Sequence, residues 1–442
     1  MENKDKTLSL NEIKEEKTAV EPESNDEKSS SHSSSGHSSY HSHHRSHHSS
    51  HKNSRRKKAN SKNKLKISNR TGWIIVVLLL VVSLAALAAY VVFGPKDNNF
   101  SNQQSGQQQS GILSVEVNNT EGLLVKNAVK QFILSDMLNP ANAQLTPSSF
   151  SKGEGRLDEE VPVSLKLSVK EGDAISYKIE LATDASFTNA QTNYLEGTLD
   201  EYEFRHLYTN TSYYYRVIAY TDKGIDTVVG SFTTADTPRI LSVEGLSNVR
   251  DIGNWKTDSG KRIKQGLLIR GTEMDAAVES GYHLTNAGLV DMLESFNIKT
   301  DIDLRAETDT SKDALGAQVD HRYYDMVMYG DIFTEAGKDK IRMVFSDLSN
   351  PEIYPVYLHC TYGCDRTGTV CYLLEAMLGV SRGDCLKDYA LSDLKIDNIK
   401  IVEEGLKAYD GDTLKEQAEN YLLSCGLSEF QLQSIRDIFL GD

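Results

Sequence analysis

The sequence predicts an α/β domain at its C-terminal end, preceded by an all-β sandwich and by a single transmembrane helix. Three observations predict this architecture. Residues 73–93 are apolar and uncharged, residues 161–234 alternate apolar with polar side chains, and the chain beyond 237 alternates short apolar runs with helical patterns. A chain of 442 residues is long enough to hold such separate domains.

The first 72 residues predict a disordered cytoplasmic tail. They are rich in Ser, His, Lys and Glu and lack the large apolar side chains that a core requires. Eight of the chain's 12 histidines lie between His32 and His51. Their spacing does not repeat, which favours a low-complexity tail over a weak site for Zn²⁺ or Ni²⁺.

Residues 73–93 predict a membrane anchor. A helix of these 21 residues, at ~1.5 Å per residue, spans the ~30 Å hydrocarbon core of a bilayer. Nine Lys and Arg residues between Lys52 and Arg70 precede the segment, whereas Lys96 alone follows it closely. This excess of positive charge indicates a cytoplasmic N-terminus. We therefore expect a single-pass protein of the cell membrane whose residues 94–442, with the catalytic domain, are extracellular.

Two segments lie between the anchor and the α/β domain. Residues 94–160 predict a linker, in which the apolar spacing from Leu123 to Met137 indicates a short helix. Residues 161–236 predict the β domain, and the spacing of Leu207 and Tyr213 within it resembles the tyrosine corner of fibronectin type III domains. This resemblance implies a spacer or a docking module without chemistry of its own.

Charge and cysteine content restrict the partners. Lys and Arg outnumber Asp and Glu by 15 to 9 in residues 1–72, but residues 73–442 hold 33 against 54. A body this acidic repels nucleic acid, so we expect no nucleic-acid partner. All five cysteines lie between Cys360 and Cys425, which is not typical of a disulfide framework and indicates at least one working thiol.

Residues 354–378 predict a strand, a tight loop and a helix within the α/β domain, residues 237–442. This order of elements directs backbone N–H groups and a helix N-terminus at an anion. Cys360 opens the loop, where the helix dipole and a nearby cation favour the nucleophilic thiolate. Arg366 offers a planar fork that holds two phosphate oxygens. The pattern indicates hydrolysis of phosphate monoesters through a phosphocysteine intermediate.

The other loop residues predict substrate binding. Gly363 permits the tight turn, and the Thr367 hydroxyl is placed to donate to the Cys360 sulfur when the thiolate leaves. The predicted substrate-binding residues are Thr361, Tyr362, Gly363, Cys364 and Thr367.

The region from Ile240 to Asp442 resembles the atypical tyrosine phosphatases of bacteria and fungi, which carry His-Cys-x-x-Gly-Lys-Asp-Arg-Thr-Gly. Four further segments match in the order of that family: Asn248–Gly253, Gly266–Arg270, Ile298–Arg305 and Asp388–Ser392. The resemblance implies an α/β cysteine-phosphatase fold and an enzyme that needs neither metal nor cofactor.

The same resemblance implies that the loop carries its own general acid, Asp365. This carboxyl would protonate the leaving oxygen and then activate water against the phosphocysteine. Asp325 is the reserve candidate for the acid, although an exposed loop carboxylate is the simpler reading of that residue.

Four residues outside the loop proper are expected to support it: His359, Arg250, Asp251 and Asp303. For Arg250 and Asp251, a structural ion pair is an equal alternative to contact with the loop. Asp303 and Arg305, at a predicted strand end, are open to the same two interpretations.

Cys364 departs from the family pattern, which has Lys at this position. Without that cation the site attracts polyanions such as phosphoinositides less strongly, which favours phosphotyrosine. A further hypothesis is that Cys360 forms a protective reversible disulfide with Cys364 or Cys371. A neutral replacement of Lys is an equal alternative.

The sequence therefore predicts a membrane-anchored protein-tyrosine phosphatase that acts on a phosphotyrosyl protein or a small phosphate ester. Two alternatives stay open: a phosphoinositide or inositol-phosphate phosphatase, and a surface adhesion protein with a vestigial phosphatase domain. Substrate assays separate the two enzymes, and substitution of Cys360 separates an enzyme from an adhesion protein.

Overall fold

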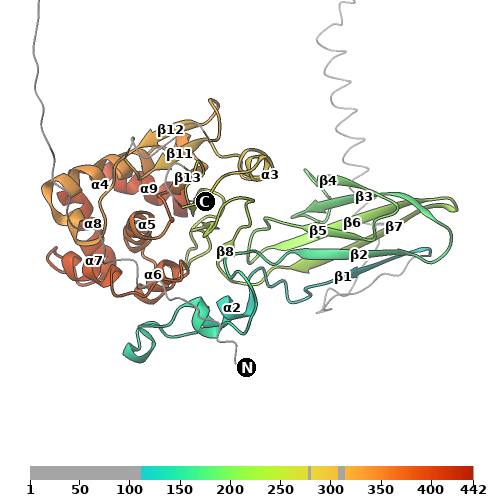
Figure 1. Ribbon diagram of the computed structural model, residues 1–442, viewed down its shortest axis with the longest axis horizontal. Coiled ribbons are helices and arrows are strands. Elements are labelled where there is room, and N and C mark those ends of the chain that lie inside the picture. Colours follow the sequence, from blue (N-terminus) through green and yellow to red (C-terminus); the bar gives the residue numbers. More distant parts are fainter. Residues whose placement is uncertain (1–110, 277–279, 307–313, 442) are drawn as a thin grey trace, which may run out of the picture. The chain divides into compact units, whose positions relative to one another are not determined.

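The computed structural model describes residues 111–276, 280–306 and 314–441 (Figure 1). The predicted tail, residues 1–72, and the predicted membrane anchor, residues 73–93, lie outside the described residues. Within the three described ranges, no helix combines the length and the apolar character that crossing a bilayer requires.

Two antiparallel sheets form a β unit, coloured blue to green in Figure 1. One sheet has the order β1-β2-β5 and the other β4-β3-β6-β7. The strands are β1 (Leu113–Val117), β2 (Val163–Val169), β3 (Ala174–Ala182), β4 (Gln191–Glu196), β5 (Glu201–Phe204), β6 (Ser212–Thr221) and β7 (Gly224–Thr233). Both sheets contribute alternate side chains to one shared core, for example Leu165 from β2 and Val217 from β6.

The β unit begins earlier than the predicted boundary at residue 161. Leu113 to Val117 pair with Val169 to Leu165 of β2, so the first strand comes from the predicted linker. The local signal was weak because β1 has only five residues and its partner lies about 50 positions further on. Between β1 and β2 the chain forms α2 (Asn127–Ile133) and two short 3₁₀ turns, Pro140–Asn142 and Pro147–Phe150.

The α/β domain is built on a six-stranded sheet of order β12-β11-β13-β10-β9-β8. The four strands from β12 to β10 are parallel, and β9 and β8 continue the sheet antiparallel. The strands are β8 (Arg239–Ile240), β9 (Arg250–Asp251), β10 (Leu268–Gly271), β11 (Thr300–Asp303), β12 (Asp320–Tyr323) and β13 (Val356–His359). The predicted α/β domain is therefore confirmed.

Both faces of this sheet are covered. Val356 and Leu358 of β13 point into the larger core, whereas Tyr357 between them points into a smaller core on the other face. The smaller core includes residues near α3 (Asn286–Val290). The helices of the larger core, orange to red in Figure 1, are α4 (Glu335–Leu348), α5 (Asp365–Leu378), α6 (Arg382–Ala390), α7 (Ile399–Leu406), α8 (Leu414–Ser424) and α9 (Glu429–Leu440).

Helix α5 is the central helix of the larger core. Every residue from Thr367 to Leu378 is buried, as the mainly apolar pattern predicts. Helix α2 packs into the same core through Val129 and Phe132, so this part of the predicted linker belongs to the α/β domain. The parallel strands end together at the N-terminus of α5, which is where α/β sheets bind ligands.

Candidate active site

Cys360 lies at the carboxyl end of β13, between the ends of β10 and β11. Its side chain is buried, and α5 begins five residues later at Asp365. Gly363 makes the turn with φ +66, and a Cβ there would collide with the carbonyl oxygen of Gly271. Only glycine fits this position, so the close approach of the loop to β10 explains the residue.

Arg366 lies in the first turn of α5 and reaches back across the loop. Its Nη2 donates to the Thr361 hydroxyl at 3.2 Å, and its Nη1 donates to the Leu304 carbonyl, just beyond β11, at 3.4 Å. The adjacent Thr367 hydroxyl is buried and has no hydrogen-bond partner among the described residues. A guanidinium held over the loop, together with the loop amides, forms a cradle suited to a phosphate.

Asp365 is held by a tyrosine that the sequence did not single out. The Tyr329 hydroxyl donates to the Asp365 carboxylate, and the Tyr389 hydroxyl lies 2.8 Å from the Tyr329 hydroxyl. Burial first, and then the hydrogen bond to Asp365, raise the pKa of Tyr329 well above its ordinary value. Tyr329 therefore stays protonated and fixes the orientation of the carboxylate.

Tyr329→Phe is expected to lower kcat for a phosphotyrosyl peptide about tenfold, because the hydrogen bond that orients the Asp365 side chain is lost. Steady-state kinetics of the full-length chain would measure this. Tyr409→Phe, which removes a hydroxyl from a ring stacked on Phe333, serves as the control. An unchanged kcat in Tyr329→Phe would show that Asp365 needs no such support.

His359 and Asp303 do not line the loop; they belong to a buried cluster of charged residues behind it. His359 Nε2 lies 3.1 Å from Asp301 and 3.9 Å from Asp303, and the ring is fully buried. Burial alone would lower the pKa of His359, but Asp303 and Asp301 raise it to about 9. The ring is therefore charged at neutral pH and neutralises part of the acidic cluster behind Cys360.

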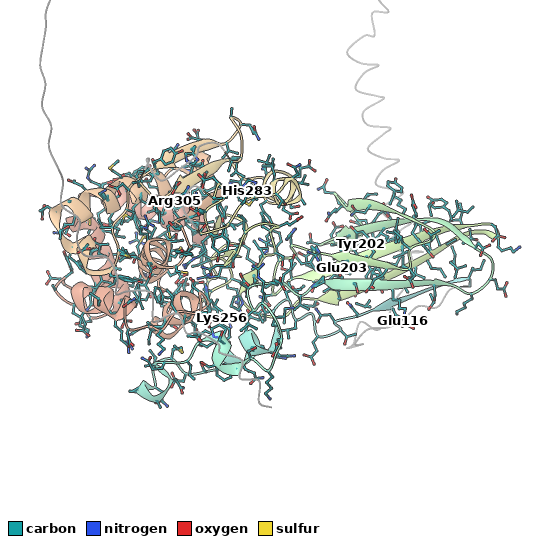
Figure 2. All side chains as sticks on the ribbon, viewed as in Figure 1. Glu116, Tyr202, Glu203, Lys256, His283 and Arg305 are labelled. Carbon is teal, nitrogen blue, oxygen red and sulfur yellow. The ribbon has the colours of Figure 1, made fainter. Side chains whose placement is uncertain are left out.

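Asp303 also binds Arg305 at 2.7 Å, and Arg305 pairs in addition with Glu273 and with Asp275 at 2.9 Å. Arg305, labelled in Figure 2, is a buried residue of the α/β domain. These ion pairs hold the chain in place directly after β11. Leu304, the first residue beyond that strand, accepts a hydrogen bond from Arg366 through its carbonyl. The ion-pair interpretation of Asp303 and Arg305 thus agrees with the geometry, and its effect reaches the loop through the backbone.

Two buried arginines fasten the loop to the sheet. Arg270 donates to the Gly363 carbonyl at 2.8 Å and to Asp388 at 2.7 Å. Arg250 donates to the other oxygen of Asp388 at 3.1 Å and to the Asn248 side chain at 2.6 Å. The Asn248 amide in turn donates to the Tyr362 carbonyl at 3.1 Å. Arg250 therefore acts on the loop through a shared network.

The two buried carboxyl groups beside these arginines, Asp388 and Glu375, have pKa shifts in opposite directions. Burial alone would raise the pKa of Asp388, but Arg250 and Arg270 hold it below its ordinary value. Burial, and then the charge of Asp388, raise the pKa of the neighbouring Glu375 well above its ordinary value. Asp388 is therefore the carboxylate that pairs with the two arginines, while the raised pKa of Glu375 favours its neutral form.

Asp388→Asn is expected to destabilise the chain by about 3 kcal/mol or more, because two buried guanidinium groups lose their anion. Thermal or urea unfolding followed by circular dichroism would measure the loss. Asp339→Asn removes an exposed carboxylate that pairs with Arg342 and is expected to change stability by less than about 1 kcal/mol. Equal effects of the two substitutions would contradict the balancing role of Asp388.

Two residues that the sequence connected with the site lie elsewhere. Asp251 binds Arg239 at 2.8 Å rather than the loop, because successive side chains of β9 point to opposite faces. Asp325, the reserve acid, is exposed and pairs with Lys340 of α4 at 2.9 Å. Neither arrangement places a carboxyl at Cys360.

Cys364 and Cys371 are both reduced, as are the other three cysteines. Burial raises the pKa of Cys364 to about 11 and that of Cys371 to about 12. Both stay thiols at neutral pH, which slows attack on an oxidised Cys360. Cys364 donates to the Tyr362 carbonyl at 3.2 Å, and the two interpretations of this residue, a protective disulfide and a neutral replacement of Lys, both stay predictions.

Four residues of the site were not singled out by the sequence pattern: Arg270, Asn248, Asp388 and Tyr329. The first three lie in segments that carry the family resemblance, yet no role was assigned to them. A charged residue within a short apolar strand, as Arg270 is in β10, is the signal that could have found it. Among the described residues, no cluster of His, Cys, Asp or Glu could hold a metal ion.

Comparisons with known proteins identify the relatives of this domain. Residues 241–430 match the profile of the tyrosine phosphatase family. A Cupriavidus necator protein, named provisionally as a tyrosine-protein phosphatase, is 25% identical over 179 residues, which cover 35% of this chain and 63% of that protein. The chain thus spans less than two thirds of this relative's length. The resemblance that the sequence indicated is confirmed.

Two solved structures were also found. The core catalytic domain of the PP-IP phosphatase SIW14 from S. cerevisiae is 14% identical, with a TM-score of 0.27, over 41% of this chain and 96% of its own. The pectate lyase Pel3 from Pectobacterium carotovorum is 14% identical, with a TM-score of 0.15, over 34% and 37%. Neither likeness is close enough to bear on the fold or the substrate.

Proposed function

We propose that the tyrosine phosphatase family domain of this chain, which matches the family over residues 241–430, hydrolyses phosphotyrosine through a phosphocysteine intermediate. One observation carries the proposal: Cys360 opens a tight loop before a buried helix, and Arg366 reaches back across that loop. A thiolate, an arginine fork and convergent backbone amides are the groups that phosphoryl transfer to sulfur requires.

In the first step the Cys360 thiolate forms a bond to phosphorus while the bond to the ester oxygen breaks. Asp365 gives its proton to that oxygen, and Arg366 with the loop amides binds the phosphoryl oxygens. In the second step Asp365 accepts a proton from water, the water oxygen bonds to phosphorus, and the sulfur leaves as thiolate. The buried Thr367 hydroxyl, without another partner, is suited to donate to that sulfur.

The preference for phosphotyrosine is supported by the charges around the loop. Cys364 replaces the Lys of the family pattern, and its neighbour Tyr362 is half exposed. Arg250 and Arg270 are buried and committed to Asp388, so they offer little to a polyanion. An aromatic phosphate monoester fits this loop better than an inositol polyphosphate does.

A substrate comparison tests the proposal on the full-length chain. We expect kcat/KM for a phosphotyrosyl peptide to exceed that for inositol polyphosphates at least about tenfold. The opposite order would favour the inositol-phosphate alternative. Loss of both activities, with the fold intact, would favour an adhesion protein with a vestigial domain.

The membrane anchor and the β unit complete the proposal. We propose that residues 73–93 hold the protein in the cell membrane with the catalytic domain outside, on the basis of the hydropathy and the flanking charge. Protease treatment of intact cells tests this orientation: cleavage of the catalytic domain without lysis is expected.

For the β unit we propose a fibronectin type III domain. Support comes from the two-sheet order and from Tyr213, whose hydroxyl accepts from the Tyr208 N–H at 2.8 Å.

A further inference from the structure

A segment outside the family match reaches the active-site loop. Residues 140–158, between β1 and β2, precede the matched region by more than 80 positions, yet they are bonded to the α/β domain. Ser148 donates from its backbone N–H and its hydroxyl to Asp393, at 3.1 and 2.6 Å. Gln144 donates to Asp397 at 2.8 Å. The segment is thus attached along one side of the domain.

Asp158 attaches the end of this segment next to the loop. Its carboxylate accepts from the Asn248 N–H at 2.8 Å and from the Ser247 hydroxyl. Burial alone would raise the pKa of Asp158, but Arg156, Ser247 and Asn248 lower it to about 2. The carboxylate is therefore ionised across the physiological range. Since the Asn248 side chain binds the Tyr362 carbonyl, Asp158 is one residue away from the loop itself.

The segment and the loop enclose a cleft of about 460 Å³. One wall is formed by the segment, with Ser151, Arg156 and Asp158, and the other includes Tyr362 and Cys364 of the loop. Tyr282 closes this second wall, since its ring meets that of Tyr362 edge to face at 6.2 Å. The volume lies in the range of ligand-binding clefts.

We propose that this cleft binds the polypeptide next to the phosphotyrosine, and that Arg156 is the specificity-determining residue for an acidic side chain there. The inference rests on the proposed phosphotyrosine phosphatase function. It goes beyond that function because the family match does not include the segment and therefore assigns nothing to it.

The charges in the cleft carry the argument. Arg156 is the single Lys or Arg among the described residues that line it. The two carboxylates there already have donors: Asp158 binds Arg156, Ser247 and Asn248, and Asp393 binds Ser148. An incoming carboxylate therefore finds one cationic partner, whereas an incoming Lys finds no unpaired carboxylate.

Arg156 is also accessible. Its side chain is 54% exposed, its bonds to Asp158 and to the Leu246 carbonyl use Nε and Nη2, and its Nε also lies 3.8 Å from the Glu159 carboxylate. Among the described residues, its Nη1 has no hydrogen-bond partner. The guanidinium is thus held in place through Nε and Nη2 and offers Nη1 to a ligand, which reduces the entropy that binding costs. The rings of Tyr362 and Tyr282 provide the apolar surface for the peptide stem.

The experiment uses the full-length chain and phosphotyrosyl peptides that carry Glu, Gln or Lys at single positions on either side of the phosphotyrosine. For the wild-type chain we expect kcat/KM with Glu to exceed that with Gln about tenfold at one position. Arg156→Ala is expected to bring this ratio close to one, and Arg156→Lys, which keeps the charge without the fork, to restore part of it.

Arg205→Ala is the matched control, because Arg205 is 51% exposed, pairs with Glu203 and lies outside the cleft. It is expected to keep the wild-type ratio. The inference fails if the wild-type chain shows no preference for Glu, or if Arg156→Ala keeps it. A wild-type chain that hydrolyses p-nitrophenyl phosphate but no phosphotyrosyl peptide would instead refute the proposed function on which the inference rests.

Discussion

Cys360→Ser is expected to reduce the hydrolysis of p-nitrophenyl phosphate by at least about 10⁴-fold, because a serine hydroxyl at this position is not ionised at neutral pH. Cys360 is buried at the end of β13, shortly before the N-terminus of α5, and Arg366 reaches back across the same loop to Thr361. No other thiol lies at the start of this loop, so no neighbour can replace it as nucleophile.

Two measurements separate loss of chemistry from loss of fold. The thermal midpoint of Cys360→Ser should stay within a few degrees of the wild-type value, because the two side chains are similar in size. Acid-quenched enzyme should carry covalent phosphate from labelled substrate in the wild-type chain and none in the variant. Cys425→Ala, at the C-terminal end of α8, removes a thiol far from the loop in sequence and is expected to retain activity. Activity of Cys360→Ser within a factor of ten of wild type would refute the mechanism.

The catalytic loop was predictable because its determinants are local in the sequence. An apolar run predicts β13, Gly363 marks the turn, and a mainly apolar pattern predicts the buried helix α5. All three lie within 25 consecutive residues, so no long-range pairing is needed to bring Cys360 and Arg366 together. The fold class followed in the same way from the alternation of short strands with helices.

The supporting network was not predictable because its contacts are distant in sequence. Arg250 and Arg270 meet Asp388 across 138 and 118 positions. Local pattern indicates that such residues are polar in an apolar setting but does not say which partner neutralises them. Arg250 and Asp251 illustrate why a local pattern is not enough to assign partners. They are neighbours on one short strand, but Arg250 pairs with Asp388 and Asp251 pairs with Arg239 on the opposite face of the sheet.

The role of residues 140–158 as one wall of the cleft was not predictable for a related reason. Residues 140–158 contain Ser, Asn, Gly and Pro at a density typical of a linker, and their local pattern predicts no regular element of any length. Their position is determined by hydrogen bonds to Ser247, Asn248 and Asp393 of the α/β domain. A fragment that starts at residue 237 would lack this wall, so substrate preferences should be measured on the full-length chain.

Asp365→Asn is expected to lower kcat for a phosphotyrosyl peptide by about 10²–10³-fold, since the tyrosine oxygen must leave without a proton. Asp365 is the first residue of α5, next to Arg366, and Tyr329 orients its carboxylate. With p-nitrophenyl phosphate, whose leaving group is stable as an anion, formation of the phosphocysteine should stay fast. Its hydrolysis should be slow, because Asp365 also activates the water.

This difference gives a signature that simple damage to the site would not produce. Asp365→Asn should release one equivalent of p-nitrophenol per enzyme in a rapid burst and then turn over slowly. Asp325→Asn, which alters the exposed carboxylate paired with Lys340, should show neither effect. A burst in Asp325→Asn and none in Asp365→Asn would assign the general acid to Asp325. Since Asp365 is bonded to Tyr329, and Asp325 is bonded to a surface lysine, the geometry favours the first outcome.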